Sequence, residues 1–199
     1  MNVDENSELR CALDEAAELV FPSSYRAKIE QLRSVHGHRI FVHPDSLDRE
    51  YNCHTFALGL NSTERYTLLT HRYQNLRLGD SDFIVSGKFM ESLRSGGVLS
   101  PIRGREKDPN RLVIYLSHGR ITHSALSLKD HLFVSKWSGS ELHDHGMWEV
   151  PASYGDKVEW YIRPSSQDAL KALELFLIRE NQELENAHKA KEQRKVGQS

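Results

Sequence analysis

Apolar residues in the first part of the chain recur every three or four positions, which is the spacing of one face of an α-helix. This spacing predicts a helix over Ser7–Val20 and a second helix over Tyr25–Ser34. The short apolar stretch Arg39–Val42 favours a strand. After a polar, mixed region, a further helix is expected from position 80 or 81 to Gly96, because glycine tolerates the left-handed conformation that commonly ends a helix.

Near residue 112 the pattern changes to continuous and alternating apolar runs, which are typical of strands. The expected strands are Leu112–Leu116, Arg120–Leu128, His131–Trp137 and Lys157–Arg163. A last helix after Ser165 has an apolar face in its first half and becomes polar after about Arg179. Helices come first, an antiparallel meander follows and a helix closes the chain. This order indicates the α+β class rather than a doubly wound sheet.

These elements divide the 199 residues into three segments. Residues 1–45 are expected to form an N-terminal helical segment, residues 46–164 the core, and residues 165–199 a C-terminal helix with a polar tail. A stretch of roughly 150 residues buries a sizeable core of its own. One domain with extensions at its ends is therefore the expected organisation.

Composition and charge narrow the class of protein. Lys plus Arg is 26 and Asp plus Glu is 28, so the net charge of −2 gives no basic field that favours nucleic acid. No segment approaches the ~20 apolar residues of a membrane span, and the polar first ten residues do not resemble a signal peptide. The two cysteines, Cys11 and Cys53, are too few for a secreted disulfide framework. A cytoplasmic thiol protein is expected.

The segment around Cys53 carries the strongest chemical signal. Asn52 is a preferred N-cap residue, so Cys53 is expected at the first position of a helix. Helical spacing places the thiol on the same face as Phe56, Ala57 and Leu60, which anchors that face in the core. Free N–H groups in a first helical turn favour the thiolate, and the N–H of Cys53 can serve an oxyanion hole. Cys53 is therefore the candidate nucleophile.

A plainer interpretation of Cys53 is a small buried residue, because free cysteine is among the most buried residue types. Cys11 lies inside the first predicted helix and has no such context, so we interpret it as a packing residue.

His123 is the candidate base. It lies in the middle of a predicted strand between apolar neighbours, where a polar ring needs a partner. In an antiparallel sheet packed on the Cys53 helix, the ring can point at the thiol, which is the geometry that a Cys–His pair requires. The small residues Ser124 and Ala125 leave room for a substrate chain.

These motifs resemble those of a known family. The run NCHTFAL at 52–58 is similar to the nucleophile helix of papain-like cysteine hydrolases, especially the compact bacterial NlpC-type branch. The runs LVIYL at 112–116, THSA at 122–125 and VSKW at 134–137 are similar to the sheet of that fold. From Val134 to Pro164 the chain also resembles an uncharacterised bacterial domain family.

The resemblance covers about Tyr51–Pro164. It implies a nucleophile helix packed on a small antiparallel sheet. It also implies an acyl-enzyme hydrolase or acyltransferase that acts on an amide or ester bond, with cysteine before histidine in the chain.

The residue that would orient His123 departs from the NlpC pattern, in which a polar residue of the next strand does so. If Lys129 and Asp130 form a two-residue turn, Lys136 lies opposite His123, and a lysine cannot accept from the imidazole N–H. A one-residue bulge would instead bring Ser135 or Trp137 opposite, and serine can accept a hydrogen bond.

A second source for the third catalytic residue is the expected loop Leu142–Gly146. A carboxylate from Asp144 or an imidazole from His145 could fold back toward His123. The expected catalytic set is Cys53, His123 and His145, with Asp144 and Ser135 as alternatives to His145.

Other histidines and aromatic residues allow further interpretations. The H-x-H pairs at 36–38 and 143–145 could in principle join Cys53 and His54 in a zinc site, although their spacing matches no zinc motif. The aromatic residues of the C-terminal third are interpreted as packing of a small sheet, with a substrate platform as the rival; they are Trp137, Trp148, Tyr154, Trp160 and Tyr161.

Two functions follow. In the first, Cys53 attacks a carbonyl of a peptide-like or acyl substrate while His123 takes and returns the proton, and no metal or other cofactor takes part. In the second, the chain is an inactive papain-like interaction domain, with a protein partner on the apolar face of its last helix. Neither function involves nucleic acid or a membrane.

Overall fold

The computed structural model describes residues 6–19, 21–43, 51–74, 76, 83–102, 108–137 and 141–196. The helices are α1 Ser7–Ala17, α2 Pro22–His36, α3 Cys53–Leu58, α4 Glu64–Arg72, α5 Gly87–Ser95 and α6 Ser166–Val196, with a short 3₁₀ helix η2 at Ala152–Tyr154. The strands are β1 Phe41–His43, β2 Ser100–Pro101, β3 Leu112–Ser117, β4 Arg120–Ser127, β5 Leu132–Lys136, β6 Leu142–Gly146 and β7 Lys157–Ile162.

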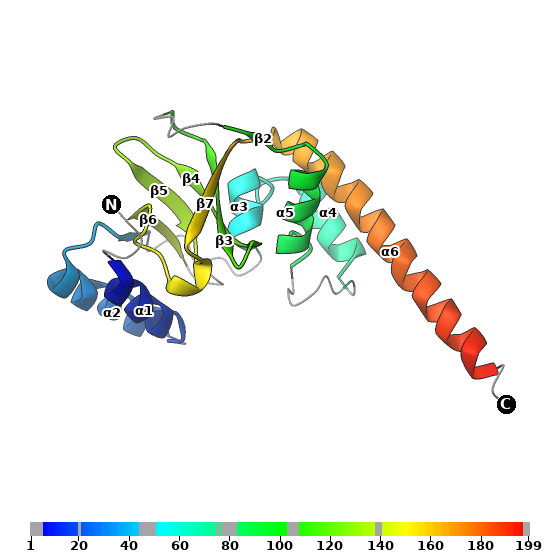
Figure 1. Cartoon of the computed structure of the whole chain (residues 1–199), viewed down its shortest axis with the longest axis horizontal. Helices are drawn as coiled ribbons and strands as arrows, with labels where there is room; N and C mark the ends of the chain where they lie inside the picture. Colours follow the sequence, from blue (N-terminus) through cyan, green and yellow to red (C-terminus); the bar gives the residue numbers. More distant parts are fainter. Residues whose placement is uncertain are drawn as a thin grey trace.

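The strands form one antiparallel sheet in the order β1-β6-β5-β4-β3-β7-β2. The α+β class predicted from the sequence is confirmed. The N-terminal helices α1 and α2 lie on one side of the sheet, and α3, α4, α5 and the start of α6 lie on the other (Figure 1).

Side-chain alternation along the paired strands separates two cores. Tyr115 pairs with His123, and both side chains belong to the face covered by α1 and α2, which we call the α1–α2 face. Ile114 pairs with Ser124, and these side chains belong to the opposite face, which we call the α3 face. Because successive residues of a strand point to opposite faces, His123 and Ser124 serve different cores.

The hairpin between β4 and β5 has a three-residue loop, so the predicted two-residue turn is wrong. The N–H of Leu128 donates to the carbonyl of Leu132 at 2.8 Å, and the enclosed residues Asp130 and His131 have φ of 57° and 59°. The N–H of Leu132 donates to the carbonyl of Lys129 at 3.2 Å, so the loop comprises residues 129–131. Leu126 consequently pairs with Val134, a register different from the one expected.

The expected helix from position 80 or 81 begins later, at Gly87. The side chain of Ser86 accepts a hydrogen bond from the N–H of Phe89, and this cap fixes the start of α5. Positions 80–82 lie outside the described residues. The polar region between α3 and α5 contains α4, a helix that the hydrophobic pattern did not predict. The side chain of Thr63 caps it.

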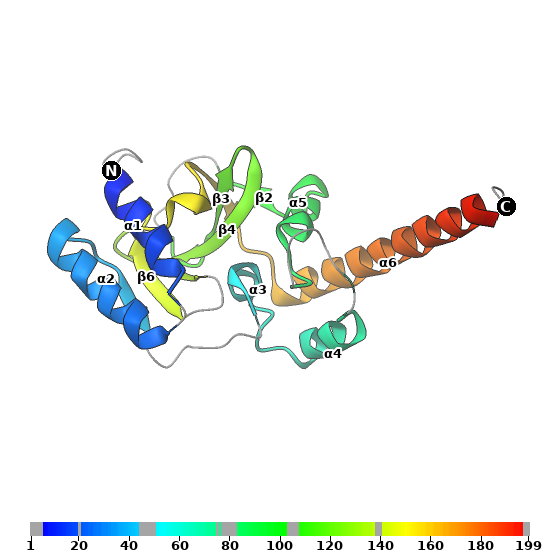
Figure 2. The same cartoon turned by 90° about the horizontal axis from the view of Figure 1, so that it is seen from below.

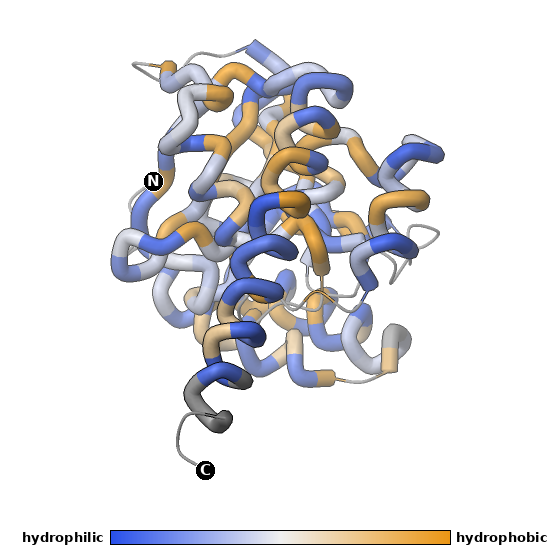
Figure 3. Tube along the Cα trace, turned by 90° about the vertical axis from the view of Figure 1, so that its right-hand side faces the viewer, coloured by the Kyte–Doolittle hydropathy of each residue, from blue (hydrophilic) through white to orange (hydrophobic). Residues whose placement is uncertain are grey.

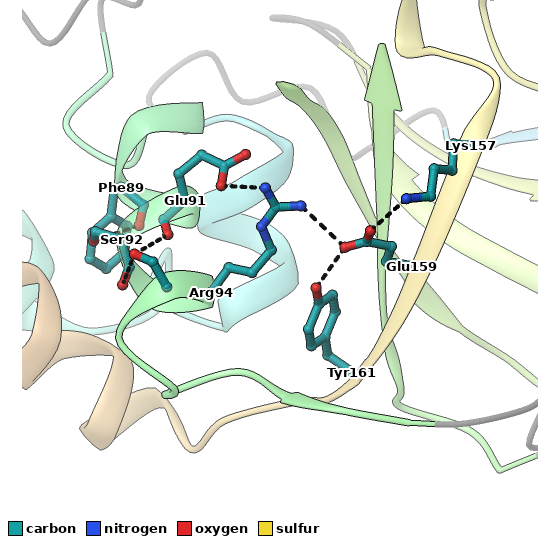
Figure 4. Close-up of polar contacts among 8 residues, drawn as sticks. Phe89, Glu91, Ser92, Arg94, Lys157, Glu159 and Tyr161 are labelled. Atoms are coloured by element: carbon teal, nitrogen blue, oxygen red, sulfur yellow. Dashed lines mark hydrogen bonds and ion pairs between the residues drawn. The ribbon is translucent and has the colours of Figure 1, made fainter. Parts of the chain in front are cut away.

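A polar network joins α5 to β7 on the α3 face. The guanidinium of Arg94 bridges the carboxylates of Glu91 at 2.7 Å and Glu159 at 3.2 Å. Glu159 also accepts from the hydroxyl of Tyr161 at 2.7 Å and from the ammonium of Lys157 at 3.0 Å (Figure 4). Partial burial acts to raise the pKa of Glu159, but these donors outweigh it and hold the pKa below its usual value.

The last helix leaves the body of the molecule along its long axis (Figures 1 and 2). Its first half packs through Leu173 and Leu177 into the core, whereas hydrophilic residues predominate toward its C-terminal end (Figure 3). Three of its apolar residues, Leu175, Ile178 and Leu184, are exposed. Within the part of the chain that the structure describes, no helix is long and apolar enough to cross a membrane.

Candidate active site around Cys53

Cys53 opens α3, as the sequence predicts, and both ends of this helix are fixed by polar side chains. The side chain of Asn52 accepts from the N–H of Thr55 at 3.0 Å, and its amide donates to the carbonyl of Val85 at 2.8 Å. At the other end, Arg163 donates to the carbonyl of Ala57 at 2.7 Å. The position of the thiol is therefore set by the cap and by two distant segments.

The Cys53 thiol is buried beside β4. Burial raises the pKa of the thiol to about 11, although hydrogen bonding from the main-chain N–H groups of Ser124, His54 and Cys53 itself acts in the opposite direction. The N–H groups at the helix start favour the thiolate, as expected, but desolvation outweighs them, so the net pKa of the thiol is raised.

His123 is held between two tyrosine rings on the α1–α2 face. Its imidazole is stacked on Tyr154, with ring centroids 3.9 Å apart and an angle of 14° between the planes, and Tyr115 lies against it at 5.6 Å. The ring is fully buried, and its Nε2 has no hydrogen-bond partner among the residues that the structure describes. Burial, with the neighbouring His145, His54 and His143, lowers the pKa of His123 well below its ordinary value. The imidazole is therefore neutral at pH 7.

The structure brings Cys53 and His123 to neighbouring positions without joining them. The N–H that approaches the sulfur belongs to Ser124, the residue directly after His123. The His123 ring was expected to point at the thiol, and no hydrogen bond joins the thiol to Nε2 of this ring in the described part of the chain. Alternation explains the separation, because Ser124 belongs to the α3 face and His123 to the α1–α2 face. The role of His123 as a base stays a prediction.

The expected third residue, His145, is already hydrogen-bonded elsewhere. It lies in β6, which the sequence interpretation took for a loop. Its Nδ1 donates to the carbonyl of Gly146 at 2.8 Å, so Nε2 of the neutral ring accepts from the hydroxyl of Ser135 at 2.8 Å. Ser135 in turn accepts from the indole N–H of Trp137 at 2.9 Å. His145 and Ser135 are thus partners of each other.

Asp144 points away from this cluster. It accepts from His43 of β1 at 3.0 Å, and its pairing with Val134 assigns it to the α3 face. The register of the β4–β5 hairpin, continued along the strands, brings Trp137 rather than Lys136 to the level of His123. The described geometry therefore supplies neither Asp144 nor Lys136 as a partner for the His123 ring.

Two residues near Cys53 were not singled out as catalytic candidates by the sequence. His54 is fully buried on α3, and its Nδ1 lies 2.7 Å from the hydroxyl of Ser124. Lys136 is also fully buried, with its ammonium 4.4 Å from the centre of the Tyr51 ring. The adjacency of Cys53 and His54 was the available signal for His54. Nothing in the sequence marked Lys136 as a buried charge.

The histidines do not assemble a metal site. His38 is bound to the backbone, since its Nε2 lies 3.1 Å from the carbonyl of Ile29 and its Nδ1 accepts from the N–H of Ile40. His143 lies 2.7 Å from the hydroxyl of Tyr25. Among the described residues, no group of three or more histidine, cysteine or acidic side chains is arranged to hold a metal ion.

A cavity of about 310 Å³ lies beside the residues that precede α3. Its described lining residues are polar or aromatic: Tyr51, Asn61, Tyr66, Thr67, Thr70, His71 and Gln74. The hydroxyl of Tyr66 lies 3.3 Å from the hydroxyl of Thr55, which connects this cavity to the first turn of α3.

Comparison of the chain with models of protein families, with curated proteins and with solved structures found no match.

Proposed function

We propose that this chain is a cysteine hydrolase or acyltransferase in which Cys53 is the nucleophile and His123 the general base. The observation that carries the proposal is the buried Cys53 thiol at the first position of α3, a helix start that the side chain of Asn52 caps. The main-chain N–H groups of Ser124, His54 and Cys53 act to lower the pKa of this thiol. Donors in this arrangement can stabilise the thiolate that forms during attack, or the oxyanion of a bound acyl group. The proposal includes a papain-like, NlpC-type arrangement and a cytoplasmic site of action.

The protonation states support a neutral pair rather than a preformed ion pair. The thiol is protonated at pH 7 because its pKa is about 11, and the buried His123 is neutral. A neutral imidazole can accept the thiol proton as sulfur attacks the carbonyl carbon, and can return it to the leaving group. The unpartnered Nε2 of His123 is the atom proposed to take the proton. Because the ring lies on the opposite face of β4 from Ser124, this transfer requires a rearrangement of β4 against α3 and not only rotation of the side chain.

The second candidate is the inactive interaction domain, with a protein partner on α6. The absence of a hydrogen bond between the thiol and Nε2 of His123 favours it, as do the exposed apolar residues Leu175, Ile178 and Leu184 on α6. In this reading, Cys53 and His123 only fill the core.

Acyl transfer from p-nitrophenyl acetate distinguishes the two candidates. The experiment uses the Cys11→Ser variant, because Cys11 is exposed and would react on its own. If the protein is a cysteine hydrolase or acyltransferase, it should release nitrophenol and carry an acetyl group that maps to Cys53. Both signals should be lost in Cys53→Ala and in His123→Ala. Folded protein that takes up no acetyl group, or takes it up equally without His123, would support the interaction domain.

A further inference from the structure

The structure offers no hydrogen-bond acceptor for His123 among the three residues expected to orient it. Ser135 and His145 are bound to each other, and Asp144 is bound to His43. The imidazole nevertheless lies in a defined plane, parallel to the ring of Tyr154 to within 14°. A stacked aromatic ring restricts rotation of its neighbour, because rotating the imidazole out of the plane would give up the contact.

The backbone that carries Tyr154 is itself fixed next to His123. The carbonyl of Tyr154 accepts from the hydroxyl of Thr122 at 2.5 Å, and Thr122 is the β4 residue directly before His123. The next residue, Gly155, has φ of 107° and its carbonyl accepts from the guanidinium of Arg10. The ring of Tyr154 is therefore held against β4 from both sides along the chain.

Burial of an unpartnered imidazole nitrogen also needs an explanation, because a nitrogen removed from water without a hydrogen-bond partner destabilises the fold. Nε2 of His123 is such an atom. A ring free to turn would be expected to find a partner in a region that contains other polar side chains. The stack on Tyr154 keeps the ring in a plane where Nε2 stays unpaired and available as an acceptor.

We infer that Tyr154 is the positioning residue of His123, and that it orients the base by ring stacking in place of a hydrogen-bonding third residue. The inference rests on the proposed function for its catalytic consequence. The orientation of the imidazole plane itself can be measured in protein that catalyses no reaction.

The kinetic test compares Tyr154→Phe with Tyr154→Leu in the Cys11→Ser protein, with the rate of Cys53 acetylation by p-nitrophenyl acetate as readout. Phe keeps the stacked ring and should retain the rate to within about threefold. Leu removes the ring and should lower the rate by about ten- to a hundredfold, as misplacement of a catalytic group does. In a His123→Ala background, Tyr154→Leu should add nothing, since Tyr154 acts through His123.

Thr122→Val is the second variant, because it loosens the backbone of Tyr154 while leaving its ring in place. An intermediate loss of rate is expected. Equal rates in the Phe and Leu variants, or a Leu effect that persists without His123, would overturn the positioning role.

Nuclear magnetic resonance of the His123 ring protons separates failure of this inference from failure of the proposed function. Stacking on Tyr154 shifts these signals upfield, so they should move downfield in Tyr154→Leu and stay in place in Tyr154→Phe. If the Cys11→Ser protein is never acetylated, the proposed function fails, and shifted ring signals would still support the orientation by Tyr154. Unchanged ring signals in the Leu variant would contradict it whatever the activity.

Discussion

Nδ1 of His54 lies 2.7 Å from Oγ of Ser124, and this contact joins the helix that carries Cys53 to the strand that carries His123. Both side chains are buried, so each depends on the other for a partner. The contact also keeps the N–H of Ser124 beside the Cys53 sulfur.

Ser124→Ala should destabilise the protein by about 1–3 kcal/mol, because it leaves Nδ1 of His54 buried without its partner. Urea unfolding followed by tryptophan fluorescence measures this loss. The matched control is Ser95→Ala, which removes a hydroxyl from an exposed site on α5 and should change stability by under about 0.5 kcal/mol. Equal midpoints for the two variants would mean that the His54 contact contributes little.

Acidification should weaken the fold through its buried histidines. Burial lowers the pKa of His54 and of His145 from the ordinary 6.5 to about 4. Between about pH 6.5 and pH 4, these histidines are protonated in the unfolded chain but neutral in the folded protein. The stability that they contribute is therefore complete above about pH 6.5 and declines below it. At pH 5 the loss should be about 2 kcal/mol for each of the two histidines.

Urea midpoints between pH 7.5 and 4.5 measure this decline. Replacing His145 with Gln should flatten the slope, whereas His71→Gln, at an exposed position on α4, should leave the slope unchanged. A slope that is the same in all three proteins would refute the assignment.

Thiol labelling of the native protein should find Cys11 first. Cys11 is exposed, whereas Cys53 is buried and its pKa is raised to about 11. With Ellman's reagent at neutral pH, one thiol should react rapidly and disappear in Cys11→Ser, and the second should react much more slowly until urea unfolds the protein. Rapid labelling of Cys53 in the folded protein would show that the sulfur is accessible and its thiolate stabilised, as the sequence had suggested.

Glu159→Gln should destabilise the α5–β7 network by less than about 1 kcal/mol, because its charges are partly exposed and screened by water. The loss should shrink at high salt. Burial, and after it the Glu159 carboxylate, raises the pKa of Tyr161 to about 12, so the same change should lower that pKa part of the way toward its ordinary value. Absorbance of the tyrosinate follows that titration, with Lys157→Gln as the control that leaves the Tyr161–Glu159 contact intact.

Local signals predicted much of this fold. The cap at Asn52 correctly placed Cys53 at the start of α3, and the apolar run from Leu112 correctly predicted β3. Both depend on residues close together in the sequence. In contrast, β6 contains His143, Asp144 and His145, which have no strand signature, and it becomes a strand by pairing with β1 and β5.

The candidate site was less predictable because it depends on which face each side chain takes. The loop that contains Asp130 and His131 has one residue more than expected, and one residue is enough to exchange the two faces of a strand. The raised pKa of Cys53 likewise follows from how deeply α3 packs, and a sequence pattern contains no measure of that depth.

Gly155 limits how this site could change over generations of mutation. Its backbone lies so close to β3 that a Cβ atom would come within 2.0 Å of the carbonyl oxygen of Leu116. Its φ of 107° also disfavours every residue with a side chain. A library of all amino acids at this position should therefore yield folded protein almost solely from glycine. Because Tyr154 is its neighbour, the chain can vary the ring beside His123 but has almost no freedom to move the backbone that presents it.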